Sequence, residues 1–153
     1  MRYVVVGAQA AIVHGVPILT EDLDVTPAPE LENLERLASA LRELDARLRT
    51  PSDPGGVVFP AVAKMLATAP SWTLTTRAGD LDLVFVPAGT RGYEDLRRDA
   101  TLVTLADDLT VPVASLADVI RCKEAAGRPK DLMQLPILRL TLEEIRAQER
   151  RER

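Results

Sequence analysis

The chain has 153 residues, of which 46% are hydrophobic, so it is long and apolar enough to bury the core of one ordinary domain. No stretch approaches the roughly 18 consecutive apolar residues of a membrane span, and the amino terminus lacks the residue order of a secretion signal. The net charge of -4 argues against a protein that binds nucleic acid over its whole surface. The aromatic content of 3% argues against a surface on which single-stranded bases stack. The single cysteine, Cys122, cannot form a disulfide within the chain, so we expect a cytoplasmic protein.

The first third of the chain predicts two strands and two helices. Residues 3–6 are mostly β-branched and residues 23–26 alternate, and both segments are bounded by glycine or proline, as strands are. Residues 8–14 are small helix formers followed by a glycine, which predicts a short helix. Between residues 30 and 48, leucines recur at steps of three and four residues, which predicts one amphipathic helix.

The middle of the chain predicts loops, a short helix and a hairpin. The segment "TPSDPGG" is rich in residues that break regular structure, so we expect a loop there. A short helix is expected around residues 62–66. Residues 72–76 and 81–86 alternate on either side of Ala78-Gly79, which predicts a β-hairpin. Residues 87–100 are interpreted as a loop that leads into a short helix.

The last third predicts a second hairpin and then helices. Residues 102–105 and 110–113 are expected to pair across an Asp-Asp turn. Ser115 and Asp118 form an N-cap pair, which predicts the start of a helix. Gly127 is expected to end that helix, and Pro129 to lie in the first turn of the next one. Thr141 with Glu144 resembles a capping box, which predicts a separate tail helix. The tail from about residue 146 is charged on all sides, and we expect it to fray into solvent.

The order of these elements predicts an α/β (α+β) fold, with a mixed sheet, flanking helices and a helical carboxyl-terminal part. We expect residues 1–113 to form the core. Residues 114–153 are expected to form helices packed on the same domain.

Two pairs of aspartates dominate the candidate chemistry. Asp22 and Asp24 share one face of their strand, and Asp80 and Asp82 share one face of theirs, because side chains alternate along a strand. If the two strands are neighbours, three or four carboxylates converge, and each pair about 4 Å apart repels by roughly 4 kcal/mol at an effective dielectric near 20. Mg²⁺ would remove that repulsion. The alternative is two separate, solvated strand edges.

Two further features are compatible with phosphate chemistry. Gly7 and Ala8 join a strand to a helix, where backbone N–H groups can bind phosphate, although the segment matches neither GxGxxG nor the Walker pattern. Anionic phosphate and acidic ligands coexist through bridging cations, as in phosphoryl transfer. Lys123 falls on the apolar stripe of its helix, so its ammonium either reaches a buried partner or extends to the surface. Asp131 could simply cap the next helix.

Four segments, "VVGAQAAIVHG", "TEDLDV", "GDLDLVF" and "VIRCKEAAGRPKDL", together resemble nucleotidyltransferase-fold proteins of the AbiEii toxin type. That family belongs to the DNA polymerase β-like nucleotidyltransferase superfamily, and the resemblance runs from Tyr3 to about Arg139. It implies a phosphate-binding turn at Gly7 and Ala8. It implies three catalytic, metal-binding carboxylates: Asp22, Asp24 and Asp82. It also implies nucleotide contacts from four residues of the carboxyl-terminal half: Lys123, Arg128, Lys130 and Asp131.

The activity implied by the resemblance is the Mg²⁺-dependent transfer of an NMP from an NTP to an acceptor. Two Mg²⁺ ions are expected, and the acceptor is expected to be an RNA (tRNA) or a protein. The setting would be a toxin–antitoxin or antiphage system, with an antitoxin as a further partner. For an RNA acceptor, a local basic patch would be needed, and its candidates are Arg91, Arg97 and Arg98.

Several departures from the family pattern keep other interpretations open. Ala8 replaces the usual glycine or serine, Ile18 stands where many relatives carry an arginine, and the first strand lacks the usual preceding helix. The missing cover would favour self-association into a homo-oligomer. The chain could instead be a non-catalytic relative that binds a nucleotide or a partner protein, or an interaction module with acidic strand edges. His14 is expected to serve packing and hydrogen bonding, and Cys122 is expected to be packed rather than reactive.

Overall fold

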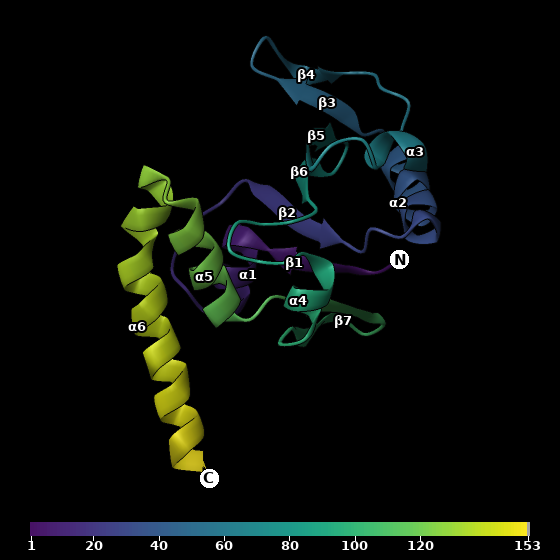
Figure 1. Ribbon diagram of the computed structural model, residues 1–153. Coiled ribbons are helices and arrows are strands. Elements are labelled where there is room, and N and C mark those ends of the chain that lie inside the picture. The colour runs from purple at the N-terminus through teal and green to yellow at the C-terminus, as the bar shows by residue number, and fades with distance from the viewer. Residues whose placement is uncertain (153) are drawn as a thin grey trace.

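Eight strands form one mixed sheet in the computed structural model, which describes residues 1–152 (Figure 1). The strands are β1 (Tyr3–Val6), β2 (Asp22–Pro27), β3 (Arg47–Thr50), β4 (Asp53–Val57), β5 (Ser71–Thr76), β6 (Gly79–Val84), β7 (Thr101–Ala106) and β8 (Leu109–Val113). The helices in this part of the chain are α1 (Gly7–Val13), α2 (Leu31–Glu43), α3 (Ala63–Leu66), α4 (Tyr93–Arg97), α5 (Leu116–Ala126) and α6 (Pro129–Glu152). The predicted α+β fold with a mixed sheet is confirmed.

The strand order is β4-β3-β5-β6-β2-β1-β8-β7, so the sheet joins segments that are far apart in the chain. At its centre, β2 runs antiparallel to β1 and parallel to β6. The parallel pairing places Asp22 opposite Asp80 and Asp24 opposite Asp82. The two acidic segments are therefore neighbours, as the first of the two sequence interpretations requires.

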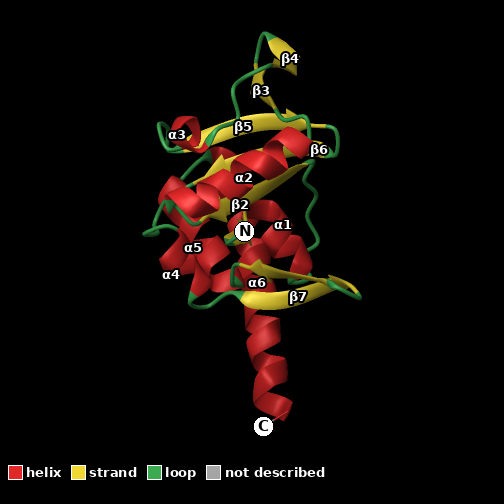
Figure 2. Ribbon diagram, turned by 90° about the vertical axis from the view of Figure 1, so that its right-hand side faces the viewer, coloured by secondary structure: helices red, strands yellow, loops and turns green. Residues whose placement is uncertain are grey.

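Helices cover both faces of the sheet. Helices α2 and α3 lie on one side, whereas α1, α5 and α6 lie on the other (Figures 1 and 2). Leu34, Leu37 and Leu41 of the α2 stripe are buried, whereas Leu31 at the start of the helix is exposed. The buried Trp72 donates a hydrogen bond to the carbonyl oxygen of Leu66 at 3.1 Å. Burial of these side chains is the main favourable contribution to folding. Asp24 and Asp82 lie on the face of the sheet that α5 covers.

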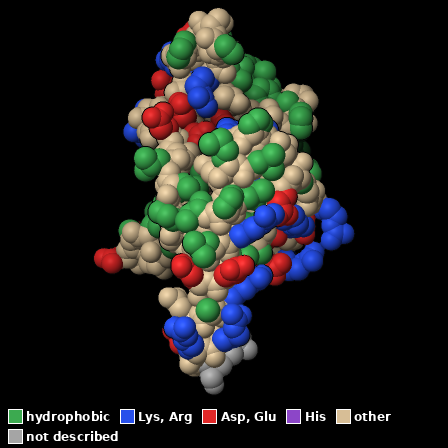
Figure 3. Space-filling model, turned by 90° about the vertical axis from the view of Figure 1, so that its left-hand side faces the viewer, with side chains coloured by type: hydrophobic (Ala, Val, Ile, Leu, Met, Phe, Trp, Pro, Cys, Tyr) green, Lys and Arg blue, Asp and Glu red, His purple; other side chains and the backbone are tan. Residues whose placement is uncertain are grey.

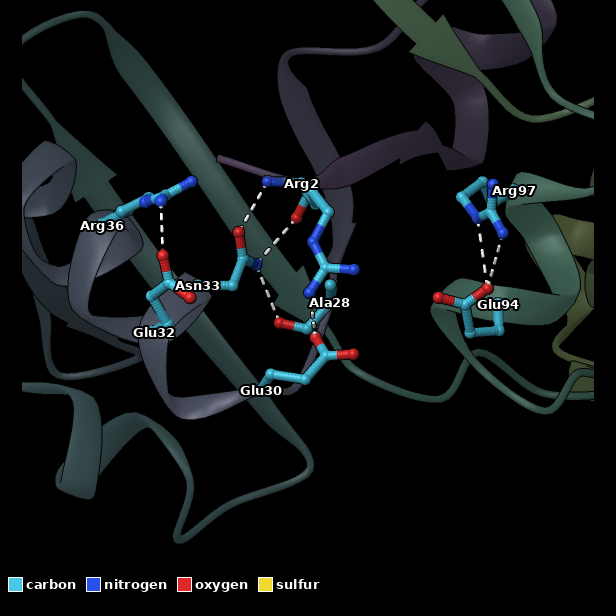
Figure 4. Close-up of polar contacts among 8 residues, drawn as sticks. All are labelled: Arg2, Ala28, Glu30, Glu32, Asn33, Arg36, Glu94 and Arg97. Atoms are coloured by element: carbon cyan, nitrogen blue, oxygen red, sulfur yellow. Dashed lines mark hydrogen bonds and ion pairs between the residues drawn. The ribbon is translucent and has the colours of Figure 1, made fainter.

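The start of β1 is fastened to α2 by one buried asparagine. Asn33 accepts a hydrogen bond from the backbone N–H of Arg2 at 2.6 Å, and its amide group donates to the carbonyl oxygens of Arg2 and Ala28, each at 2.8 Å (Figure 4). The side chain of Asn33 hydrogen-bonds three backbone groups, of which the carbonyl oxygen of Arg2 also accepts from the backbone N–H of Ala28. It thereby sets the position of the strand that leads to Gly7.

The helix predicted over residues 30–48 is too long. Helix α2 ends at Glu43, and Asp45 adopts the left-handed conformation with a φ of 50°, which a helix cannot continue through. Residues 47–57, whose second half was predicted to be a loop, form the β3–β4 hairpin instead. The alternation of Arg47, Leu48 and Arg49 suits a strand, and pairing with β5 stabilises it.

The carboxyl-terminal part also differs from the prediction. The expected cap at Thr141 lies within α6, because its buried hydroxyl donates to the carbonyl oxygen of Ile137 at 3.0 Å. The tail expected to fray from residue 146 is helical through Glu152, and Arg153 lies outside the described residues. Figure 1 shows this half of α6 extending away from the body. In residues 1–152, we find no helix with both the length and the apolarity that crossing a membrane requires.

Other local signals are confirmed. Both predicted hairpins are present, as β5–β6 and β7–β8. The hydroxyl oxygen of Ser115 accepts a hydrogen bond from the backbone N–H of Asp118 at 3.1 Å, which caps α5. Gly127 ends α5 in the left-handed conformation, and Pro129 occupies the first position of α6.

Candidate functional site

Three carboxylates meet where β2 and β6 run side by side. Asp22, Asp24 and Asp82 each offer an oxygen, and these oxygens all lie within 4.8 Å of one another. The hydroxyl of Thr20 donates to the carboxylate of Asp22 and orients it. Asp80, the fourth aspartate of the two pairs, is not part of this group. We call Asp22, Asp24 and Asp82 the carboxylate cluster.

A cavity of about 450 Å³ opens beside the cluster. Its lining contains six of the nine residues to which the sequence assigned a role: Gly7, Asp24, Asp82, Lys123, Arg128 and Asp131. Apolar side chains from β1, β6 and α5 complete the wall. Figure 3 shows acidic side chains gathered in the upper part of the face that carries α5 and α6, with basic side chains next to them. Residues from both halves of the chain therefore border one space.

The negative charge of the cluster is unfavourable in the free protein. The pKa of Asp24 is raised to about 6, first by burial and then by the charges of Asp22 and Asp82, whereas Lys123 and Lys130 oppose the increase. Burial also raises the pKa of Asp82. Oxygen-only ligands that carry an excess of negative charge are what hard divalent cations prefer. The residues present therefore fit Mg²⁺.

Gly7 brings the backbone close to the cluster. Its φ of 67° lies in the left-handed region, and a Cβ atom at this position would overlap the carboxylate of Asp24. Only glycine meets both demands. Ala8 follows it as the second residue of α1 and is half-buried, outside the lining of the cavity.

Lys123 reaches a buried partner rather than the surface. Its side chain is 11% exposed, and its Nζ donates to Oδ1 of Asp131 at 2.9 Å. Arg128 donates to the other oxygen of Asp131, which is only 1% exposed. Although burial opposes ionisation, these two hydrogen bonds lower the pKa of Asp131. Asp131 is therefore a positioning residue for Lys123, a role that its expected place at a helix start did not indicate.

Arg49 is the residue at this site that the sequence interpretation missed. Its Nη1 lies 3.1 Å from Oδ2 of Asp80, and its Nη2 lies 3.4 Å from Oδ1 of Asp82. The signal was available in the alternation of Arg47, Leu48 and Arg49, which indicates a strand with two basic residues on one face. It was hidden because Leu48 also extends the leucine spacing of the helix before it.

The remaining residues that the sequence singled out do not line the cavity. Lys130 is exposed on the first turn of α6. Of the predicted basic patch, Arg97 is paired with Glu94, as Figure 4 shows, and Arg91 and Arg98 are exposed. Ile18 packs against the hydrophobic core.

The single histidine and the single cysteine have the roles expected of them. His14 makes a 2.8 Å hydrogen bond through Nε2 to the carbonyl oxygen of Ala114, as a packing role requires. Burial raises the pKa of the Cys122 thiol to about 11, so the nucleophilic thiolate is scarce at neutral pH.

Comparisons with known proteins do not identify a family. A scan against protein-family models finds no model that matches this chain, and a search of curated proteins finds no significant match. Membership of the AbiEii type therefore stays a prediction from the four sequence segments.

Proposed function

We propose that this protein is a Mg²⁺-dependent nucleotidyltransferase that transfers an NMP from an NTP to an RNA (tRNA) or protein acceptor. The observation that carries the proposal is the carboxylate cluster, two of whose members, Asp24 and Asp82, line the same cavity as Lys123. Carboxylates for cations on one side and an ammonium group on the other are what a triphosphate and its metal ions require. The resemblance to the AbiEii toxin type supports the same reaction.

Each residue would act through its place around the cavity. Asp22 and Asp24 would hold Mg²⁺, and Asp82 would complete a second site and take up the proton of the acceptor hydroxyl. Bound Mg²⁺ would supply positive charge to the phosphate oxygens. The backbone of Gly7 and Ala8 would approach a phosphate, since no side chain separates Gly7 from the cluster.

In the transfer, the acceptor oxygen bonds to the α-phosphorus while the bond between that phosphorus and pyrophosphate breaks. Lys123 would offset the charge that develops on the leaving pyrophosphate. Asp131 would keep the ammonium in place through the 2.9 Å hydrogen bond, because placement decides how much a charge contributes.

A second candidate function is nucleotide or partner binding without catalysis. It is favoured by the pairing of two expected catalytic groups with other side chains, Asp82 with Arg49 and Lys123 with Asp131. In this case, an NTP with Mg²⁺ would raise the melting temperature, but no nucleotide would be transferred.

The test is a transfer assay with the purified protein, Mg²⁺, each of four α-labelled NTPs, and total RNA or cell lysate as the source of acceptor. We expect one NTP to label a discrete acceptor and Asp24→Asn to reduce labelling at least about 100-fold. The matched control is Asp107→Asn, which changes an exposed aspartate in the turn between β7 and β8. Full activity of a folded Asp24→Asn protein would contradict the proposal. An NTP-dependent thermal shift without labelling would favour the second candidate.

A further inference from the structure

Arg49 contacts the carboxylate cluster from β3, whereas Lys123 belongs to α5. Leu48 pairs with Leu74 in the sheet and packs against the core, so its neighbours Arg47 and Arg49 point to the other face. There Arg49 contacts Asp80 and Asp82, while Arg47 is paired with Asp45 at 3.2 Å. One basic side chain of β3 therefore already occupies part of the cluster.

The contacts of Arg49 are loose for an ion pair. The distances of 3.1 Å and 3.4 Å exceed the approximately 2.7–2.9 Å of strong charge-assisted hydrogen bonds. Among the described residues, no hydrogen-bond acceptor reaches the buried Nε of Arg49. A buried donor without a partner weakens the arrangement. The guanidinium is thus held by charge rather than by a complete set of hydrogen bonds.

The strand that carries Arg49 lies next to the exposed edge of the sheet. Strand β4 forms the edge of the sheet, and Gly56 is its one residue that is not fully exposed. The pairing of β3 with β4 is irregular between Leu48 and Thr50, which is the position of Arg49. Segments with few buried contacts open at low cost. Because Arg49 points away from the core that Leu48 contacts, its side chain can leave Asp82 while β3 stays paired with β5.

We propose that Arg49 is a built-in cation that competes with a divalent metal ion for Asp82 and so limits metal loading of the free protein. The inference rests on the proposed function, because it assumes that the carboxylate cluster binds metal. While Arg49 lies against Asp82, its charge repels a further cation and offsets the carboxylate that would attract one. Once displaced, the guanidinium is free to pair with an anionic ligand bound next to Asp82, which is a triphosphate in the proposed reaction.

The test is a titration of the protein with Mn²⁺ alone at pH 7.5. Binding is measured by calorimetry and by electron paramagnetic resonance. We expect Arg49→Gln to bind Mn²⁺ about tenfold more tightly than the wild type and to show a larger rise in melting temperature on adding Mn²⁺. Arg49→Lys keeps the charge and should stay near the wild type. Arg47→Gln is the matched control, because it removes a charge from the same strand that does not contact the cluster, and it should change neither measurement.

A second measurement uses the wild type and does not depend on the folding of a variant. Phenylglyoxal modifies accessible guanidinium groups, and its reaction with Arg49, followed by mass spectrometry, should increase when Mn²⁺ is added. Reaction at Arg47 should stay constant and serves as the internal control.

The outcomes separate this inference from the proposed function. Unchanged or weaker Mn²⁺ binding by folded Arg49→Gln, or unchanged modification of Arg49, overturns the competition while metal binding by the wild type stands. Mn²⁺ binding by Arg49→Gln alone supports the competition and contradicts metal use by the natural protein. An absence of binding in every variant overturns both.

Discussion

Asp24 is the carboxylate whose ionisation is most disfavoured by its surroundings. Folding raises its pKa from 3.8 to about 6, so the native state holds the proton more tightly than the unfolded state. The associated stability is fully present below pH 3.8 and is lost as the pH rises through about 6. A shift of this size corresponds to at most about 3 kcal/mol. Ionisation of Asp24 therefore lowers the free energy of unfolding at neutral pH.

We predict that Asp24→Asn is more stable than the wild type at pH 8 in metal-free buffer, because the amide carries no charge. The difference in the free energy of unfolding should be about 1–3 kcal/mol and should disappear near pH 4. Urea denaturation at several pH values measures it. Added Mg²⁺ should stabilise the wild type more than Asp24→Asn. A difference between the two proteins that does not vary with pH would count against the assigned cause.

In contrast to Asp24, Asp131 is stabilised in its ionised form, because its carboxylate is buried against both Lys123 and Arg128. We predict that Asp131→Asn lowers the free energy of unfolding by about 2–4 kcal/mol, because Lys123 would keep a buried ammonium without a counter-charge. Asp99→Asn, which changes an exposed residue, should alter it by less than about 0.5 kcal/mol. Chemical denaturation compares the two. Equal effects would mean that the Lys123 pair adds nothing to stability.

At the scale of elements, the junction of β1 and α1 is the most constrained connection near the site. Gly7 is the first residue of α1 and Gly15 follows the helix, and both have a positive φ, of 67° and 88°. A Cβ atom at Gly15 meets nothing within 4 Å, whereas one at Gly7 would collide with Asp24. Substituting Gly15 therefore measures the cost of backbone strain alone, whereas substituting Gly7 adds the cost of a clash with Asp24.

We predict that Gly15→Ala costs about 1 kcal/mol, from the backbone alone, and that Gly7→Ala costs at least about 2 kcal/mol more. Gly7→Ala should also weaken Mn²⁺ binding, because Asp24 must move aside. Thermal melts and Mn²⁺ titration of both variants provide the measurement. If Gly7→Ala behaves like Gly15→Ala in both assays, Asp24 is not packed against Gly7.

The β3–β4 hairpin shows why some elements could not be predicted from the sequence. Leu44 and Leu48 are four residues apart, which continues a helical stripe, while Arg47, Leu48 and Arg49 alternate as in a strand. Local patterns leave these alternatives balanced, and pairing with β5, which is distant in the sequence, decides between them. Arg49 was missed for this reason. Similarly, the capping signal at Thr141 was overridden because its hydroxyl found a partner one helical turn earlier.

At the scale of the whole molecule, alternation along β2 and β6 was enough to predict which aspartates share a face. It could not predict that the two strands are adjacent, which only the long-range pairing settles. The same holds for Lys123, whose place in an apolar stripe indicated a buried partner without identifying Asp131. Sequence thus indicated the chemical groups of the site, and the sheet determined which of them meet.

The extended half of α6 contributes little to the body of the protein. Residues 146–152 are exposed except for the half-buried Ala147. We predict that ending the chain after Arg146 changes the free energy of unfolding by less than about 0.5 kcal/mol, since little surface becomes uncovered. Denaturation of the shortened and full-length proteins tests this. A larger loss would reveal a contribution of the tail to the fold.

The parallel pairing of β2 with β6 also constrains when the carboxylate cluster can assemble during synthesis. Asp22 and Asp82 belong to segments whose contact depends on closing a long stretch of chain, which is a slow and late event. Lys123 and its partner leave the ribosome later still. During synthesis, the cluster can therefore form only after Asp82 has left the ribosome, and the contact between Lys123 and Asp131 can form only after both aspartate-bearing strands have emerged.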